Sequence, residues 1–233
     1  MTEAGLWCEK TFGYRFRDPG HLDHALTHRS AAGQNNERLE YLGDAVLGLI
    51  IAEVLYRRLP DATEGELSRL RASLVKGGTL AQLALDAGLG GWLKLGSGEL
   101  KSGGYRRESI LANALEAVIG AAYIDGGFDV ARDLVVALFQ DRLDNLPPAD
   151  ELKDAKTRLQ ELLQSRGLPL PVYTMESRSG EAHKQSFLVS CTLADSGMTS
   201  SGGGRSRRQA EQEAAGRMIE TLAGDPDMSG DNG

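Results

Sequence analysis

Three acidic residues occupy the first turns of a segment that is largely apolar. Glu37, Glu40 and Asp44 lie in "NERLEYLGDAVLGLIIAEVLY", residues 36–56. Because they are three and four residues apart, a helix places their side chains along one stripe. Burying an unpaired carboxylate costs several kcal/mol, so these side chains must be paired, protonated or bound to a cation.

A second apolar segment has the same feature. In "RESILANALEAVIGAAYID", residues 107–125, Asn113 and Glu116 are three residues apart and share a helical face. If the two helices face each other, they gather four oxygen-bearing side chains: those of Glu40, Asp44, Asn113 and Glu116. Oxygen ligands without Cys or His favour a hard cation, with Mg²⁺ the first choice.

The same residues also allow a surface without a metal. In that interpretation Glu37 and Glu40 form ion pairs with Arg38, Arg69 or Arg71 in contact with solvent. Residue spacing alone does not decide between the two interpretations.

The segments that must position these side chains are helical. Apolar residues recur every three or four positions in 39–58, 66–87, 109–125 and 129–143. No stretch here alternates as a strand does, so residues 1–147 are predicted to form an all-α domain. Paired prolines and scattered charges in "DNLPPADELKD" indicate an exposed linker, placed at 148–153.

After the linker the pattern changes. "TRLQELLQSRG" predicts a helix that Gly167 ends, and residues 187–194 alternate as a half-buried strand does. "PVYTMES" and "GMTSS" are the candidates for two further strands, and 206–222 predicts an amphipathic helix. Residues 154–223 should therefore form a small α+β domain, in the order α-β-β-β-α. The last residues, 224–233, have the composition of a disordered tail.

Charge is unevenly distributed between the two parts. The net charge of −7 argues against a nucleic-acid partner when taken alone. However, residues 1–150 hold 16 Lys and Arg against 21 Asp and Glu, whereas residues 153–223 hold 10 against 8. The excess of acid belongs to the first part, and the second part is slightly basic.

The sequence indicates a soluble cytoplasmic protein without membrane association. Its two cysteines, Cys8 and Cys191, form no CxxC pair or disulfide-dense pattern. The N-terminus lacks the features of a secretory signal. The longest apolar run, residues 45–56, contains Glu53 and is shorter than the roughly 20 residues that cross a bilayer.

Several motifs together resemble the bacterial ribonuclease III family. "ERLEYLGDAVL", residues 37–47, resembles the family signature, and segments over nearly the whole chain agree in order. In the first domain they are "LTHRS" (26–30), "EGELSRLRASLV" (64–75) and "GELKSGGYRRESILANALEA" (98–117). The second domain resembles a double-stranded RNA-binding domain through "KTRLQELLQSRGLPLPVY", "GEAHKQSF" and "GRSRRQAEQEAA".

This resemblance implies roles for the acidic residues. It assigns Glu40, Asp44 and Glu116 to a catalytic magnesium site, where Mn²⁺ can substitute, with Asp44 and Glu116 closest to the chemistry. It gives Glu37 and Glu64 secondary acidic roles, with salt bridges as the alternative. Asn113 stands where the family most often has aspartate. The amide keeps one oxygen ligand but removes a negative charge, so we expect a higher magnesium requirement.

The resemblance also implies how RNA is held. A-form RNA is recognised through phosphates and 2′-hydroxyls more than through base edges. The implied RNA-binding residues are Thr157, Gln160, Glu161 and Gln164 on the first helix, His183 between strands, and Arg205, Arg207 and Arg208 at the start of the last helix. Lys101, Arg106 and Arg107 are weaker candidates for phosphate contacts beside the acidic site.

The implied function is a magnesium-dependent endoribonuclease that cuts double-stranded RNA and leaves 5′-phosphate and 3′-hydroxyl ends. Ribosomal RNA precursors, with some mRNA and tRNA precursors, are the expected substrates. Family members cut both strands as homodimers, and Tyr41 is the candidate contact between subunits, with core packing as the alternative.

Three alternatives remain at this stage. The first is a non-cleaving double-stranded RNA-binding regulator or scaffold. The second is a helical metal phosphohydrolase that acts on nucleotides, which would have no use for residues 153–223. The third is a histidine acid–base mechanism that uses the RNA 2′-hydroxyl; the candidates are His21, His24, His28 and His183.

Overall fold

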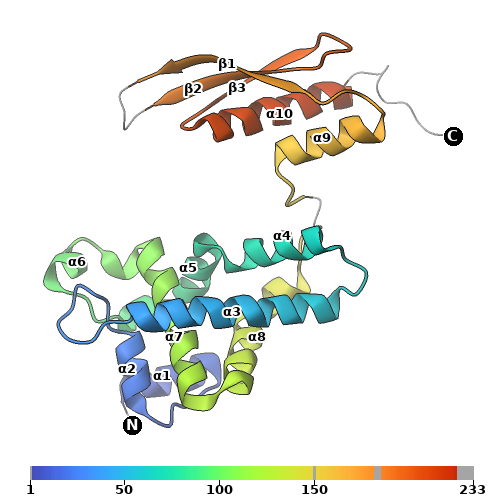
Figure 1. Ribbon diagram of the computed structural model, residues 1–233. Helices are drawn as coiled ribbons and strands as arrows, with labels where there is room; N and C mark the ends of the chain where they lie inside the picture. Colours follow the sequence, from blue (N-terminus) through green and yellow to red (C-terminus); the bar gives the residue numbers. More distant parts are fainter. Residues whose placement is uncertain (1, 149–150, 181–184, 225–233) are drawn as a thin grey trace. The chain divides into compact units, whose positions relative to one another are not determined.

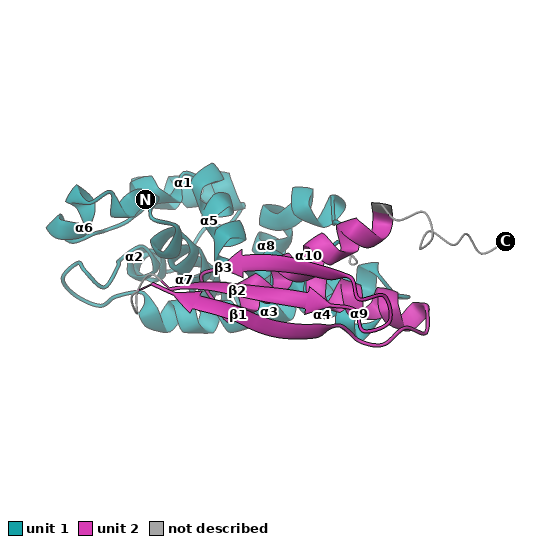
Figure 2. Cartoon of the chain, turned by 90° about the horizontal axis from the view of Figure 1, so that it is seen from above, with its two compact units in different colours: residues 1–152 teal, residues 153–233 magenta. Residues whose placement is uncertain are grey.

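The computed structural model describes residues 2–148, 151–180 and 185–224 (Figure 1). The chain divides into two compact units, residues 1–152 and residues 153–233, which Figure 2 shows in different colours. The first unit is helical and the second contains a helix, three strands and a helix, which confirms the predicted fold class. The predicted tail began at residue 224, but Gly224 belongs to the last helix; residues 225–233 and His183 lie outside the described residues.

The first unit is a bundle built around two long helices, α3 (Glu37–Arg58) and α7 (Glu108–Gly126). The other helices and 3₁₀ turns of this unit are α1 (Glu3–Phe12), α2 (Pro19–Ala25), α4 (Glu64–Val75), α5 (Gly77–Asp86), η1 (Leu89–Trp92), α6 (Ser97–Lys101), η2 (Gly104–Arg106) and α8 (Phe128–Asp144). Within this part of the chain, no described helix combines the length and apolar character needed to cross a bilayer.

Helix α7 lies in the centre of this bundle. Every residue from Ile110 to Ala122 is buried except Asn113 and Glu116, which are partly exposed. A helix that is apolar on nearly all sides is surrounded by other elements, here α2, α3, α5 and α8. Within this buried stretch, the two polar side chains therefore mark the place where the helix reaches solvent.

Two glycines allow α3 and α7 to approach closely. A Cβ atom on Gly43 would lie 1.8 Å from the backbone oxygen of Glu116, and one on Gly120 would lie 2.3 Å from the backbone oxygen of Leu39. Both distances are far inside van der Waals contact, so the crossing requires glycine on both helices. Gly43 lies between Glu40 and Asp44 in sequence, and the crossing therefore brings these acids next to Glu116.

Residues 66–87 form two helices rather than one continuous helical segment. Helix α4 ends at Val75, and Lys76 adopts an extended conformation with φ −66° and ψ 148° before α5 begins at Gly77. Apolar periodicity continues across this break because both helices contribute to the same core. The pair of glycines after Lys76 was the local signal for a break.

The second unit is a three-stranded antiparallel sheet covered by two helices. The strands β1 (Val172–Ser179), β2 (Ser186–Thr192) and β3 (Thr199–Gly204) pair in the order β1-β2-β3. Helices α9 (Ala155–Ser165) and α10 (Arg207–Gly224) pack against each other, and α10 also contacts β2 and β3 (Figure 1). Gly167 has a φ of 66° just after α9, as its predicted role in ending this helix requires.

A small apolar core joins the sheet to its helices. Leu159 and Leu163 of α9, Cys191 of β2, and Met218 and Leu222 of α10 are among its buried side chains. Gly202 lets α10 pack closely on β3, because a Cβ there would lie 2.2 Å from the backbone nitrogen of Ala214. The start of α10 and the outer face of α9 are left free of the core.

Candidate active site

The side chains of Glu40, Asp44, Asn113 and Glu116 line one cleft in the first unit. The cleft has a volume of about 540 Å³ and lies where α3 and α7 cross. The crossing predicted from the two helical stripes therefore exists, and it brings all four predicted ligands to the same cavity. We call these four side chains the acidic floor.

The acidic floor destabilises the ionised form of its most buried member. Burial, followed by the negative charges of Asp44 and Glu40, raises the pKa of Glu116 to about 7. The pKa of Glu40 is also raised, mainly by burial, although a hydrogen bond with Asn113 opposes this shift. Carboxylates in such surroundings favour a neighbouring positive charge or a proton.

The donor set fits a hard divalent cation, although the acids do not form a preassembled cluster. In the described part of the chain, no group of three or more His, Cys, Asp or Glu side chains is arranged to hold a metal ion as it stands. Mutual repulsion favours such separation when no cation is present. Three carboxylates and one amide around a common cavity nevertheless supply only oxygen, the donor that Mg²⁺ prefers.

The secondary acids differ in their positions. Glu37 lines the cleft and pairs with Arg29 at 3.5 Å, rather than with any of the arginines considered from the sequence. Both side chains are more than half exposed, so the pair contributes little to stability. Glu64 lies at the start of α4, outside the residues that line this cleft, where Ser68 Oγ donates a hydrogen bond to it at 2.7 Å.

One described histidine, His28, lines the cleft. Its Nδ1 accepts a hydrogen bond from the backbone nitrogen of Ser30 at 3.2 Å and lies 2.8 Å from Ser30 Oγ. Burial is the main cause that lowers the pKa of this histidine, which favours the neutral ring that an accepting Nδ1 requires. His24 is held elsewhere, with Nε2 2.6 Å from the backbone oxygen of Asn35.

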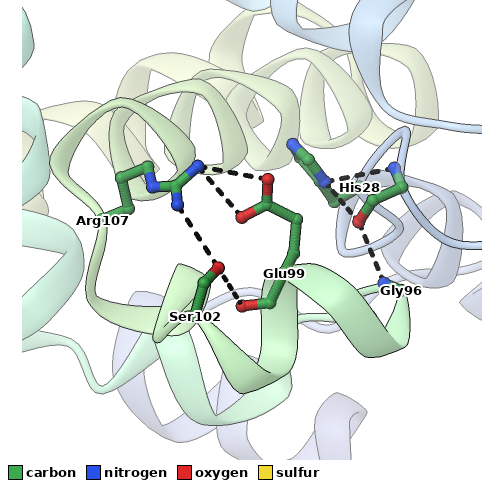
Figure 3. A network of polar contacts seen from close by, with 6 residues as sticks. His28, Gly96, Glu99, Ser102 and Arg107 are labelled. Carbon is green, nitrogen blue, oxygen red and sulfur yellow. Dashed lines mark hydrogen bonds and ion pairs between the residues drawn. The ribbon is translucent and has the colours of Figure 1, made fainter.

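The rim of the cleft contains two residues whose pairing was not anticipated. Arg107 was a weak candidate for phosphate contact, whereas Glu99 was not considered. Figure 3 shows Glu99 between Arg107 and His28, with Ser102 and Gly96 nearby. Arg107 Nη1 lies 3.1 Å from Glu99 Oε1. The local signal was a carboxylate eight positions before an arginine across a Gly-rich loop, which sequence alone does not distinguish from solvated charges.

The second unit presents the predicted RNA-binding residues at two places. Gln160, Glu161 and Gln164 are exposed on α9 and Thr157 is partly exposed, on the face opposite the core leucines. Glu161 pairs with Lys153 at 2.6 Å. At the other place, the exposed cations Arg205, Arg207 and Arg208 surround the start of α10.

Glu211 restrains one of these cations, a role that sequence reasoning missed. Its carboxylate accepts a hydrogen bond from Arg207 Nε at 2.8 Å and pairs with Lys156 of α9 at 2.6 Å. Lys156 Nζ also lies 4.4 Å from the centre of the Tyr173 ring. Hydrogen bonds from Lys156 and Arg207 lower the pKa of Glu211. The start of α10 is thereby tied to α9 and β1.

Comparison with family models gives one match to each unit. Residues 18–143 match a family described as ribonuclease-III-like, and residues 155–222 match the double-stranded RNA binding motif. The first match covers the acidic floor and the second covers both candidate RNA-binding places.

Similar proteins extend over most of the chain. The chain is 56% identical to a protein named ribonuclease 3 from Alkalilimnicola ehrlichii, over 90% of this chain and 92% of that protein. It is 58% identical to a ribonuclease 3 from Nitrosococcus oceani, over 92% and 93%. The crystal structure of the nuclease domain of ribonuclease III from Campylobacter jejuni matches with a TM-score of 0.58 and 39% identity, over 63% of this chain and 99% of that domain.

A second structure of the Campylobacter jejuni nuclease domain is also similar. It matches with a TM-score of 0.57 and 41% identity, over 58% of this chain and 95% of that chain. In that structure, a region of the nuclease domain that is involved in dimer formation is structurally flexible.

Proposed function

Because the chain belongs to the ribonuclease III family, we propose that its acidic floor is the catalytic centre of an endoribonuclease that cleaves double-stranded RNA. The observation that carries this assignment is the close crossing of α3 and α7 at Gly43 and Gly120. The crossing makes Asp44 and Glu116, from distant parts of the sequence, line one cleft.

Glu40, Asp44, Asn113 and Glu116 are the residues that would hold Mg²⁺, with Mn²⁺ as an alternative. When bound, the cation supplies an activated water and positive charge for the phosphate. Asn113 contributes its amide to the hydrogen bond with Glu40 and offers an oxygen ligand, directly or through water. Asp44 and Glu116 lie closest to the chemistry, and Glu116 must give up its proton to act.

Hydrolysis by an activated water leaves a 5′-phosphate and a 3′-hydroxyl. The rival mechanism needs two histidines as acid and base around the RNA 2′-hydroxyl. Of the histidines in the described ranges, His28 alone lines the cleft, and its Nδ1 is already occupied by Ser30. A 2′,3′-cyclic phosphate at the product ends would refute hydrolysis by water.

The second unit supports double-stranded RNA as the substrate. The cations at the start of α10 can contact phosphates, and the polar face of α9 can contact the 2′-hydroxyls of the minor groove. Glu211 holds Arg207, and the charge of Arg208 acts on the carboxylate of Asp154 at the start of α9. Recognition by shape leaves substrate choice to RNA structure, and ribosomal RNA precursors are the expected targets, with some mRNA and tRNA precursors.

We further propose that the chain acts as a homodimer, because one cleft has one acidic floor and can cut one strand. Helix α3 carries an apolar stripe formed by Tyr41, Leu49 and Tyr56, which are 81%, 59% and 72% exposed. Their spacings of eight and seven residues place them within a narrow sector of the helix. Exposed apolar side chains gathered in this way are typical of a protein interface.

The first test is cleavage of a long RNA duplex with Mg²⁺ by the wild-type chain and by Glu116→Ala. We expect the wild type to cut and the variant to lose activity by at least about a hundredfold, as for removal of a group that acts in the transition state. Duplex binding measured in parallel should be nearly unchanged, because α9 and α10 are intact. A duplex that stays whole with both proteins would favour a non-cleaving regulator.

A further inference from the structure

Glu99 has no role in the proposed chemistry, but its carboxylate pairs with the guanidinium of Arg107 at the edge of the cleft. Glu99 of α6 and Arg107, which precedes α7, both line the cavity. Arg107 Nη1 lies 3.1 Å from Glu99 Oε1 and 3.0 Å from Oε2, and Nη2 donates a hydrogen bond to Ser102 Oγ at 3.4 Å (Figure 3). Ser102 Oγ in turn donates to the backbone oxygen of Glu99 at 3.1 Å.

The two partners differ in exposure. The Glu99 side chain is 26% exposed and that of Arg107 is 47% exposed. Oε2 of Glu99 is buried and, within the described residues, accepts no regular hydrogen bond, so the charge of Arg107 is its main compensation. The guanidinium, with five donors, retains N–H groups that Glu99 and Ser102 do not use. Glu99 is therefore the more firmly fixed partner of the pair, and the guanidinium of Arg107 can still bind another anion.

The segment that carries Glu99 is itself fixed beside the cleft. The backbone nitrogen of Gly96 donates a hydrogen bond to Ser30 Oγ at 2.9 Å. A Cβ on Gly96 would lie 2.1 Å from the backbone oxygen of Ser30, so the two segments touch. His28 holds Ser30 from the other side, and its backbone nitrogen donates to the backbone oxygen of Lys94 at 3.0 Å. The position of the Glu99 carboxylate thus follows from backbone packing.

A guanidinium in this cavity has competing partners. Glu40, Asp44 and Glu116 are carboxylates that line the same cleft as Arg107. An unrestrained arginine side chain is long and flexible, and it pairs readily with carboxylates. If Arg107 turned toward the acidic floor, it would neutralise the charge that the divalent cation needs.

We propose that Glu99 is a positioning residue that keeps Arg107 at the rim of the cleft and away from the acidic floor. Arg107, so held, contacts a phosphate of the bound RNA, because a guanidinium matches phosphate oxygens in charge and geometry. Glu99 thereby prevents the guanidinium of Arg107 from competing with the divalent cation for the carboxylates of the acidic floor. This inference rests on the proposed function, because it takes the acidic floor as the metal site.

The test measures Mn²⁺ binding to the full-length protein without RNA, with free Mn²⁺ followed by electron paramagnetic resonance. The variants are Glu99→Gln, Arg107→Met and the double variant. We expect Glu99→Gln to weaken Mn²⁺ binding about twofold to fivefold, the range of a partly exposed ion pair. Arg107→Met alone should change binding little, and adding it to Glu99→Gln should restore wild-type affinity.

Comparison of the two single variants with the double variant distinguishes two explanations: movement of Arg107 into the acidic floor, and a change in the electrostatic potential at the metal site. If charge acts only through space, Arg107→Met alone strengthens binding by as much as Glu99→Gln weakens it, and the two effects add; that result would overturn the proposal. Work at about 0.15 M salt limits effects over more than about 8 Å. Glu99→Asp, which keeps the charge but shortens the reach to Arg107, should weaken Mn²⁺ binding as Glu99→Gln does, and an unchanged affinity would also overturn the proposal.

Two further variants complete the design. Glu53→Gln removes a carboxylate that is 27% exposed and paired with Arg57 at 2.7 Å on α3, so it matches Glu99 in exposure and pairing but lies outside the cleft lining. It should leave Mn²⁺ affinity unchanged. Glu116→Gln should weaken Mn²⁺ binding strongly. If it does not, the proposed metal site fails; if it does and the Glu99 variants match the wild type, only the role of Glu99 fails.

Discussion

At the scale of single residues, Glu116 is the carboxylate of the acidic floor whose ionised form is most destabilised by its surroundings. Burial and the charges of Asp44 and Glu40 raise its pKa to about 7. A pKa that is higher in the folded than in the unfolded state means that the folded protein binds this proton more tightly. The associated stability is present below the unfolded pKa of about 4.3 and is lost as pH rises through about 7. At higher pH a cation can replace the proton.

We therefore expect Mg²⁺ to raise the Tm of the free protein more at about pH 8 than at about pH 6, because the cation competes with a proton at the lower pH. Calorimetry with and without Mg²⁺ measures the difference. Glu116→Gln cannot ionise and should lose most of the dependence on pH. An equal gain in Tm at both pH values in the wild type would show that Glu116 does not titrate together with cation binding.

In the proposed metal site, Asn113 contributes a neutral amide where an aspartate would add one negative charge. Its side chain is hydrogen-bonded to Glu40, so Asn113→Asp places a second carboxylate there. We expect the Mg²⁺ concentration for half-maximal cleavage to fall about threefold to tenfold, since one added charge near the cation is worth about 1 kcal/mol. Titrating cleavage of a duplex with Mg²⁺ measures the change. Asn113→Ala should shift it the opposite way, and no change in either variant would exclude Asn113 as a ligand.

At the scale of elements, the crossing of α3 and α7 depends on glycine. Gly43→Ala would place a Cβ 1.8 Å from the backbone oxygen of Glu116, so the helices must separate. We expect a loss of about 1–3 kcal/mol of unfolding free energy, as for overpacking of a core, together with a larger fractional loss of cleavage. Urea denaturation and single-turnover cleavage measure the two effects.

Gly77→Ala is the matched control for this crossing. Gly77 begins α5, and a Cβ there would meet no atom within 4 Å. Its unfolding free energy should stay within about 0.5 kcal/mol of the wild type or rise slightly, because alanine restricts the unfolded chain. Equal stabilities for the two alanine variants would contradict a crossing that requires glycine.

The period of apolar residues was sufficient to predict the long helices and one strand of the sheet. It predicted α3 and α7 because apolar side chains recur every three or four residues in each, and it predicted β2 because residues 187–194 alternate. It did not separate α4 from α5, because both helices contribute buried side chains to one core and the apolar pattern continues on both sides of Lys76. Periodicity reports which face is buried and is insensitive to a turn between two helices with a shared core.

The floor of the cleft was predictable and its rim was not. Glu40 and Glu116 stand out because they interrupt apolar helices. Glu99 and Arg107 lie in a Gly-rich loop of mixed charge, where nothing in the sequence sets which ion pairs form. Their pairing follows from the docking of Gly96 on Ser30, a contact between segments 66 residues apart. Likewise, Glu37 pairs with Arg29 across a loop that periodicity does not describe.

At the scale of the whole molecule, two cuts in a duplex require two clefts. Each first unit has one acidic floor, and α3 connects that floor to the apolar stripe of Tyr41, Leu49 and Tyr56. Tyr41 belongs to both, since it lines the cleft and is 81% exposed. Association through this stripe would place a second cleft at a fixed distance from the first, which a monomer cannot do.

We expect Leu49→Glu combined with Tyr56→Glu to produce a monomer. Burying two carboxylates in an apolar interface is expected to cost more free energy than association through this stripe contributes. Neither residue lines the cleft, so the acidic floor stays intact. Sedimentation velocity at micromolar concentration measures the oligomeric state, and denaturing against native gels distinguish nicks from double-strand cuts. The variant should lose double-strand cuts more than nicks.

Leu6→Glu serves as the control for this variant, because Leu6 of α1 is 49% exposed and lies apart from α3 in sequence. It should sediment and cut as the wild type does. A dimeric Leu49→Glu/Tyr56→Glu variant would show that subunits meet elsewhere. A wild-type chain that sediments as a monomer yet cuts both strands in one binding event would contradict the homodimer, because a single acidic floor would then have to serve two phosphates on opposite strands.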